Sequence, residues 1–252
     1  MIDLHTHILP GIDDGSRTPG DALEMARAAL ADGTRVVAAT PHVREDWPTS
    51  PELMEARVAD LRHALAETRI PLQILTGGEI DLHRLDVLSD EELQRFGLGG
   101  NPDYLLVEFP YYGWPLGLAN RVLGLRERGI TPVLAHPERN GDVQGNPERL
   151  RPLVDAGVLC QVTAASLDGR IGRRSRACGF TLIETGLAHL VASDGHTPDI
   201  RGIGMSRAAA ALGDEELARW LTYEVPAAIV GGLSLPPRPP VTPRRFSLFG
   251  RS

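Results

Sequence analysis

The stretch MIDLHTHILPGIDDG, residues 1–15, decides how the rest of the chain is interpreted. Its first residues are typical of a short buried strand, and His5 and His7 follow with one residue between them. Because alternate residues of an extended segment point to the same side, both imidazoles should face one way. Asp13 and Asp14 come next, after a Pro-Gly turn. Two histidines and a carboxylate can begin a metal site, although an isolated HxH motif is about as often one exposed histidine and one bonded to the backbone.

Short apolar strands and amphipathic helices alternate about seven times along the chain, without a linker or an internal repeat. Further strands are expected at residues 36–40, 72–76, 104–107, 131–135, 158–162 and 187–192. Helices are expected at residues 19–31, 51–67, 116–128, 147–156, 175–185, 205–212 and 214–223. This pattern predicts an α/β fold with a parallel sheet, and 252 residues suit one (β/α) barrel of the TIM type. An open doubly wound sheet is the alternative, and the absence of GxGxxG after the first strand counts against it.

The formal net charge of −7 gives the protein no general attraction for nucleic acid, anionic lipid or other polyanions. We therefore expect no nucleic-acid partner, and a phosphorylated substrate would need locally placed arginines or metal ions. The basic residues are all arginine. The lack of lysine excludes a Schiff-base lysine, a P-loop lysine and a carbamylated lysine that bridges two metals.

The two cysteines, Cys160 and Cys178, are too few for a disulfide framework and favour a reducing compartment. Neither has an arginine six positions later, so the C-x5-R loop of cysteine-dependent phosphatases is absent. The N-terminus lacks the basic and apolar regions of a signal peptide, and no apolar run reaches membrane-spanning length. These features predict a cytoplasmic protein without direct membrane insertion.

Side chains that bind metals fall at the C-terminal ends of the expected strands, or just after them. They are His5, His7, His42, Glu79, Glu108, His136, Asp194 and His196. In a (β/α) barrel these ends converge on the face that carries the active site. Chance could place one or two histidines there, but eight ligands from six strands indicate a metal centre. The other histidines, His63, His83 and His189, are expected to be surface or packing residues.

With Asp14 the set has nine members, which is too many for one ion, so two or three metals and a bridging carboxylate such as Glu79 are implied. Imidazole and carboxylate ligands without thiolate suit Mn, Fe or Zn.

Six segments resemble one known superfamily. They are MIDLHTHILPGIDDG, ATPH (39–42), GGEI (77–80), LLVEFP (105–110), LAHPERN (134–140) and ASDGH (192–196), and they resemble the PHP (polymerase and histidinol phosphatase) superfamily. The GIDDG and HPERN segments are similar to the PHP-type protein-tyrosine phosphatases of bacterial capsule and exopolysaccharide clusters. This resemblance implies a distorted (β/α)7 barrel over residues 1–235. It also implies a phosphatase that acts on the tyrosine-phosphorylated C-terminal tail of a bacterial tyrosine autokinase and so regulates capsule or exopolysaccharide biosynthesis.

The resemblance also implies a trinuclear site, most often with manganese. His5, His7, Glu79 and Asp194 would hold one ion; the second would have Glu79, Glu108 and His136, and the third Asp14, His42 and His196. Arg139 and Arg201 match the phosphate-binding arginines of the family. Hydroxide that bridges the metals would then attack phosphorus directly, without a phosphoenzyme. Residues 161–166 depart from the usual asparagine-bearing turn, which leaves the shape of that rim open.

Three other functions fit parts of the pattern. A histidinol-phosphate-type phosphatase tends to have histidine where this chain has Asp14 and Glu108. A PHP nuclease would conflict with the negative charge and with the lack of a basic, aromatic stripe. A regulator that binds a phosphotyrosine tail without turnover would not need a complete ligand set.

The Pro- and Arg-rich residues 236–252 cannot bury a core and are expected to form a disordered tail.

Overall fold

The structure is a computed structural model that describes residues 1–108, 110–198 and 202–240. Its strands are β1 (Ile2–Thr6), β2 (Val36–Ala39), β3 (His42–Val43), β4 (Gln73–Leu75), β5 (Glu79–Asp81), β6 (Tyr104–Glu108), β7 (Thr131–Ala135), β8 (Leu159–Thr163) and β9 (Leu190–Ala192). All strand pairs are parallel, in the orders β1-β2-β4 and β3-β5-β6-β7-β8-β9.

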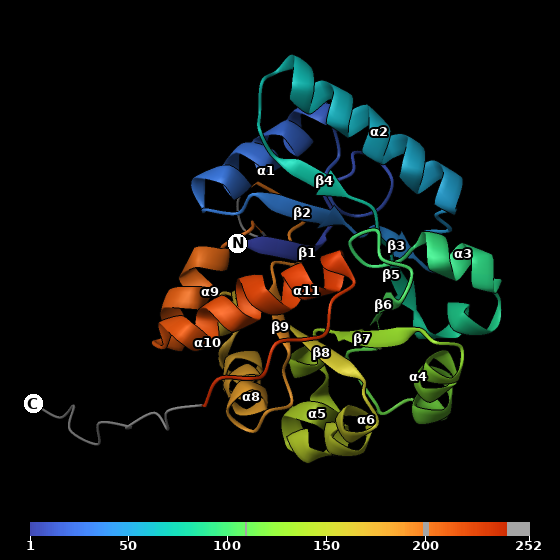
Figure 1. Cartoon of the computed structure of the whole chain (residues 1–252), viewed down its shortest axis with the longest axis vertical. Helices are drawn as coiled ribbons and strands as arrows, with labels where there is room; N and C mark the ends of the chain where they lie inside the picture. Colours follow the sequence, from blue (N-terminus) through green and yellow to red (C-terminus); the bar gives the residue numbers. More distant parts are fainter. Residues whose placement is uncertain (109, 199–201, 241–252) are drawn as a thin grey trace, which may run out of the picture.

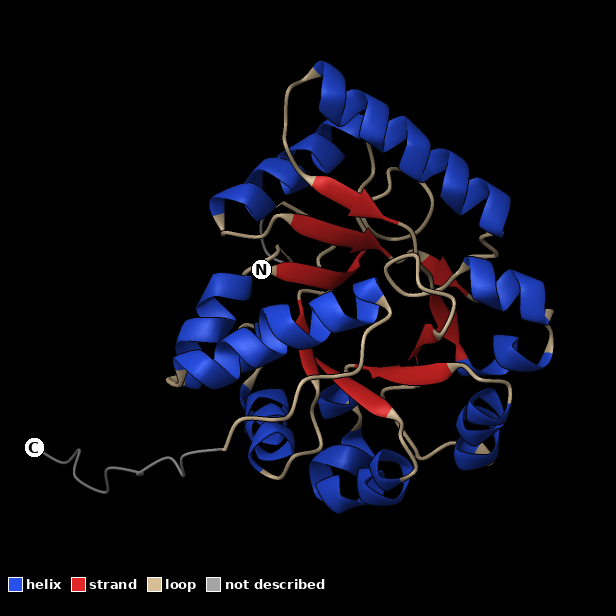
Figure 2. Ribbon diagram, viewed as in Figure 1, coloured by secondary structure: helices blue, strands red, loops and turns tan. Residues whose placement is uncertain are grey.

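The two sheets form one ring. Strand β2 leads directly into β3, and β4 leads into β5, so the same two segments pair in both sheets. At the other edge Thr6 bridges Gly195, just after β9, and the Asp194 amide donates to the His5 carbonyl at 2.9 Å. Seven parallel strand segments therefore follow one another around the core, in the arrangement expected for a distorted (β/α)7 barrel. Helices lie outside them (Figure 1, Figure 2), and the predicted α/β fold with parallel strands is confirmed.

The longer helices are α1 (Pro19–Ala31), α2 (Pro51–Glu67), α4 (Leu118–Glu127), α8 (Arg173–Glu184) and α9 (Met205–Leu212). Shorter ones are α3 (Asp90–Arg95), α5 (Gly141–Gly145), α6 (Arg151–Asp155), α7 (Ala164–Leu167), α10 (Glu215–Arg219) and α11 (Val225–Gly231). The turns η1 (Leu82–Asp86), η2 (Pro137–Arg139) and η3 (Pro147–Leu150) are 3-10 turns, and η4 (Trp220–Glu224) is a π turn. The predicted bounds of α1 and α2 are confirmed, because Thr18 and Ser50 cap them and a proline begins each.

The structure differs from the expected elements in several places, among them the division of the helix expected at residues 147–156 into η3 and α6. The helix expected at residues 214–223 continues to Gly231, because the π turn η4 precedes Pro226 and accommodates its missing N–H. Helix α3 was not expected, although Ser89 and Glu92 form the capping box that begins it. Strand β9 begins at Leu190, so His189 lies before the strand and its Nδ1 accepts from the Cys160 amide at 3.1 Å.

The first residues of the expected tail contact the barrel. The Pro236 carbonyl accepts a hydrogen bond from Trp220 Nε1 at 3.1 Å. Arg238 donates to the carbonyls of Ala188 and Ile183, and its guanidinium lies 5.5 Å from the Trp220 ring centre. Residues 241–252 lie outside the described residues. Among the described helices, none has both the length and the apolar character needed to cross a membrane.

Apolar side chains fill the body of the barrel and polar ones follow at its C-terminal end. Leu4, Leu106, Val133 and Val191 are fully or almost fully buried, as both faces of a parallel sheet require. The strand ends then present buried histidines and carboxylates instead of apolar groups.

Candidate metal centre

All nine side chains expected as metal ligands lie together at this end of the barrel. Their ligand atoms form four overlapping groups, each within 4.8 Å: His7, Asp14, His42 and His196; His5, Glu79 and His136; His5, His7 and Asp194; and His42, Glu79 and Glu108. Eight of the nine are buried, whereas the Asp14 side chain is 45% exposed. The groups share members, as expected for neighbouring ions with common ligands, and their assignment to individual ions stays a prediction.

Hydrogen bonds fix which nitrogen of each opening histidine faces the centre. His7 Nδ1 lies 2.7 Å from Asp13 Oδ2, and His5 Nδ1 lies 2.9 Å from Gln161 Oε1. Both partners are acceptors. Asp13 is a carboxylate, and Gln161 Oε1 also accepts from the His136 amide, at 3.3 Å. Each Nδ1 therefore carries the hydrogen, and the Nε2 lone pairs of both rings face inward.

The inward atoms have the chemistry of a cation site. His5 Nε2 and His7 Nε2 are 3.3 Å apart, and Glu79 Oε2 lies 3.3 and 3.2 Å from them. Asp194 Oδ1 is 3.5 and 3.4 Å from the same nitrogens. With the hydrogens on Nδ1, these four atoms are all acceptors, and they repel one another unless positive charge lies between them. The residues therefore fit the metal ions that the sequence implies.

The same demand for positive charge appears in the pKa values. Burial opposes ionisation of Glu79, but His5 and His42 outweigh it and hold the pKa of Glu79 well below its usual range. Burial, and then repulsion from Glu79, raises the pKa of Glu108 to about 7. Two carboxylates this close need a shared positive partner to be ionised together.

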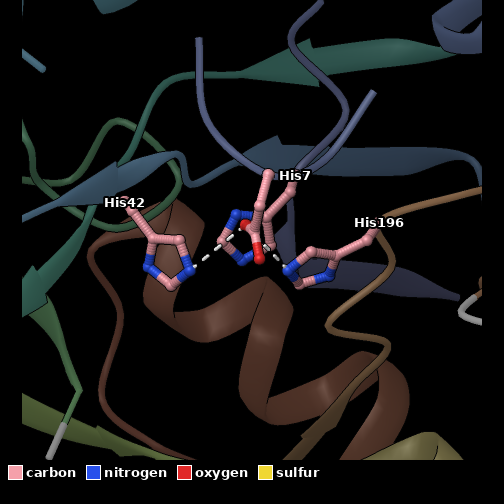
Figure 3. A group of neighbouring side chains, drawn as sticks. His7, His42 and His196 are labelled. Atoms are coloured by element: carbon pink, nitrogen blue, oxygen red, sulfur yellow. Dashed lines mark ion pairs between the residues drawn. The ribbon is translucent and has the colours of Figure 1, made fainter. Parts of the chain in front are cut away.

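His42 and His196 complete the open side of the centre. His196 Nδ1 lies 2.8 Å from the Asp194 carbonyl, so its Nε2 faces Asp14 Oδ1, at 3.3 Å. His42 presents Nε2 to Asp14 Oδ1 at 3.4 Å and Nδ1 to Glu79 Oε2 at 3.1 Å. Figure 3 shows the rings of His7, His42 and His196 turned toward one another. His42 thus lies between the exposed and the buried parts of the centre.

Two candidate ligands have a backbone that is rare for their residue types. His136 has φ 39° and Asp194 has φ 52°, both in the left-handed region. Such a conformation costs about 1–3 kcal/mol outside glycine and persists where the surrounding structure enforces it. Here it turns each side chain from the end of its strand into the centre, and His136 Nε2 reaches Glu79 Oε1 at 2.9 Å.

Of the two arginines expected to bind phosphate, one is described. Arg139 Nη1 donates to Asp194 Oδ2 at 2.5 Å, and its guanidinium lies 4.5 Å from the Tyr111 ring centre. Arg139 is thus at the edge of the metal centre, held between a carboxylate and an aromatic face. Arg201 lies outside the described residues.

Known proteins are similar to this chain in sequence and in fold. The family model described as capsular polysaccharide synthesis, CpsB/CapC, matches residues 1–230. The chain belongs to the CpsB/CapC family. Its relatives include the tyrosine-protein phosphatase YwqE of Bacillus subtilis, 35% identical over 99% of both chains. The putative tyrosine-protein phosphatase CapC of Staphylococcus aureus is 30% identical over 78% of this chain and 77% of its own.

A crystal structure from a study of YwqE and of Streptococcus pneumoniae CpsB, described there as unique metal-dependent tyrosine phosphatases, superposes with a TM-score of 0.86. The two chains are 32% identical, and the match covers 97% of this chain and 100% of the other. Membership in the CpsB/CapC family confirms the resemblance seen in the sequence.

Within this family member, the structure assigns supporting roles that sequence reasoning missed. Asp13 Oδ2 holds His7 and also accepts from the His42 amide at 3.0 Å, so one carboxylate orients two candidate ligands. Its position directly before Asp14 in the opening motif was the available signal. Gln161 orients His5, and it lies in the segment that departs from the asparagine-bearing turn.

Glu138 ties that segment to the HPERN turn. Its Oε1 accepts from the Thr163 amide at 3.0 Å and from the Ser166 hydroxyl at 2.6 Å. Burial raises the pKa of Glu138 to about 7. The rim left open by the sequence is therefore the end of β8 followed by α7, held against the turn that carries Arg139.

Proposed function

We propose that the protein is a metal-dependent protein-tyrosine phosphatase that removes phosphate from the tyrosine-phosphorylated C-terminal tail of a bacterial tyrosine kinase. In this proposal it regulates capsule or exopolysaccharide biosynthesis from the cytoplasm. The observation that carries the proposal is the inward cluster of acceptors formed by His5, His7, Glu79 and Asp194. Relatives such as the tyrosine-protein phosphatase YwqE support the choice of substrate.

Manganese is the proposed ion, in three positions, with Fe or Zn as alternatives that suit the same nitrogen and oxygen ligands. When bound, the ions supply Lewis-acid charge for the phosphate and generate hydroxide from water at neutral pH. The ligand sets proposed for them are those given by the resemblance. Two features of the structure support them: Asp14, His42 and His196 lie in one group of neighbouring ligand atoms, and Glu79 belongs to two groups.

The chain's own residues provide orientation and phosphate binding. Asp13 and Gln161 fix the tautomers of His7 and His5, so that the ligand nitrogens are ready before an ion arrives. Arg139 is placed to exchange part of its contact with Asp194 for phosphate oxygens, which a planar guanidinium binds in pairs. A tyrosyl leaving group departs as a phenolate with a pKa of about 10 and needs little help from an acid.

The test is a two-substrate assay. Phosphate release is measured with manganese from a tyrosine-phosphorylated kinase-tail peptide and from histidinol phosphate, with His136→Ala as the inactive control. We expect turnover of the peptide and a loss of about 10²-fold or more in the variant. If only histidinol phosphate is hydrolysed, the protein is a small-molecule phosphatase. If the peptide binds but neither substrate is hydrolysed, it is a regulatory binder.

A further inference from the structure

A groove of about 780 Å³ opens beside the metal centre. Glu108, one of the candidate ligands, lines it together with Arg44, Arg84, Tyr111 and Tyr112, and the carboxylates of Glu45, Asp46 and Asp81 also belong to the lining. We call it the Glu108 groove. Clefts of roughly 300–1,000 Å³ hold ligands much larger than a phosphate group, so this one has room for several side chains.

One wall of the Glu108 groove presents an arginine without an ion pair to any described residue. Arg84, in η1, is partly buried, and its Nε is shielded from solvent without a hydrogen-bond acceptor. The positive charge of Arg84 also acts on Glu92, but the two form no ion pair. The Glu92 carboxylate instead accepts hydrogen bonds from the Ser89 hydroxyl at 2.7 Å and from the Ser89 amide at 2.8 Å. Because no described acceptor holds this guanidinium, an anionic group of a ligand can pair with it without displacing an existing partner.

The neighbouring arginine shows the contrast. Arg44 donates to both oxygens of Asp46 at 2.7 Å, and its Nη1 lies 3.6 Å from Glu108 Oε2. Its charge is therefore already compensated inside the groove. Among the described arginines that line this groove, Arg84 is the one left to meet an incoming carboxylate.

The lining of the groove also includes exposed aromatic side chains. Tyr112 lines the groove with 88% of its surface exposed, and Leu116, in the same loop between β6 and α4, is 94% exposed. Large exposed apolar side chains next to a binding cleft are typical of surfaces that contact another protein. A small metabolite such as histidinol phosphate would use neither this rim nor the length of the groove.

We propose that the Glu108 groove holds the polypeptide next to the phosphotyrosine, and that Arg84 pairs with an acidic side chain of that polypeptide. This inference rests on the proposed phosphatase function and adds a sequence preference to it. The phosphate lies at the metal centre beyond Glu108, and the flanking residues run between η1 and the Tyr112 loop. Arg84 is then a specificity residue and takes no part in the reaction itself.

The test uses phosphotyrosine peptides in which one Glu is moved through the flanking positions of an otherwise all-Gln parent. The value of kcat/KM is measured for the manganese-loaded wild type, for Arg84→Gln, and for Arg27→Gln. Arg27 is exposed on α1, so its variant makes the same charge change away from the groove. p-Nitrophenyl phosphate, which has no flanking residues, reports on folding and on the metal centre.

We expect Glu at one or two positions to raise kcat/KM about fivefold in the wild type, the upper range for a partly exposed ion pair. Arg84→Gln should abolish this preference and leave turnover of p-nitrophenyl phosphate unchanged, while Arg27→Gln keeps the preference. The inference is overturned if the wild type prefers Glu nowhere, or if the preference survives in Arg84→Gln. A failure of the proposed function looks different, because no phosphotyrosine peptide would then be hydrolysed at all.

Discussion

Replacing Asp13 by asparagine tests whether an outer carboxylate builds this metal centre. Asp13 accepts three hydrogen bonds: from His7 Nδ1 at 2.7 Å, from the Gly15 amide at 2.9 Å and from the His42 amide at 3.0 Å. All three donors compete for two oxygens, and Asp13→Asn turns one oxygen into an NH2 group. In either orientation of the amide, at least one donor meets another donor instead of an acceptor.

The magnitude follows from these bonds. A hydrogen bond to a charged acceptor contributes about 1.5–3 kcal/mol, so the metal-free variant should unfold about 2 kcal/mol more easily. His7 also loses the negative charge that makes its Nε2 a better ligand. Loss of such an outer partner lowers metal affinity about 10–100-fold, or about 1.4–2.7 kcal/mol. The variant should still fold, since domains are usually stable by about 5–15 kcal/mol.

Manganese affinity is measured by competition with a chelator, and turnover of p-nitrophenyl phosphate is followed against manganese concentration. The deficit of Asp13→Asn should shrink as manganese is raised. Asp86→Asn is the matched control, because Asp86 pairs with Arg121 on the surface at 2.7 Å and away from the ligands. Unchanged affinity in Asp13→Asn would refute the role of Asp13, and so would a loss of turnover that no manganese concentration reduces.

Three further predictions concern the frame around the centre. Gly15→Ala should destabilise the fold by about 3 kcal/mol and impair metal binding, because the added Cβ would overlap the His7 carbonyl; thermal melting with and without manganese checks this. Cys178→Ser should keep its turnover, and alkylating reagents should not inhibit the wild type, because burial raises the pKa of that thiol to about 12. Burial lowers the pKa of His189 from 6.5 to about 4, so the unfolded chain takes up a proton first as the pH falls and stability declines below pH 6.5. Between pH 7.5 and pH 5 the free energy of unfolding in urea should fall by about 2 kcal/mol through this residue in the wild type, and His189→Asn should lose less. Equal losses in the two proteins would contradict this prediction.

The order of helices and strands could be predicted from the sequence, because the spacing of apolar residues and the helix-capping residues indicated the same boundaries. Helices at residues 19–31 and 51–67 were placed to the residue, since a capping hydroxyl and a proline define each start. Their packing on a parallel ring followed from the alternation alone. The local pattern could not predict that two strand segments are divided. The break at residues 40–41 separates β2 from β3, and the break at residues 76–78 separates β4 from β5, so that the strands form two sheets.

The candidate ligands were accessible for a related reason. A barrel sends every strand end to one face, so position along the chain is enough to predict that His5, His136 and Asp194 meet. The partners that orient them were not accessible. Gln161 reaches His5 across 156 positions of sequence, and nothing in a local window distinguishes it from any other buried polar residue. The same is true of Glu138, whose partners lie at the end of β8 and in α7.

The exposure of the ligands gives the direction in which the substrate lies. His5, His7 and Glu79 are fully enclosed, whereas Asp14 is half exposed and Glu108 borders the groove. His42 spans these two, with Nε2 3.4 Å from Asp14 and Nδ1 3.6 Å from Glu108.

We therefore expect a phosphate to approach over the Asp14–His42–Glu108 side of the described centre. Arg139 approaches this phosphate from the Asp194 side, because its guanidinium is anchored there. Attack in line with the leaving group then requires that group to point away from the enclosed ligands. In the proposal made above, that group and its polypeptide enter the Glu108 groove, which is lined by Arg84 and Tyr112.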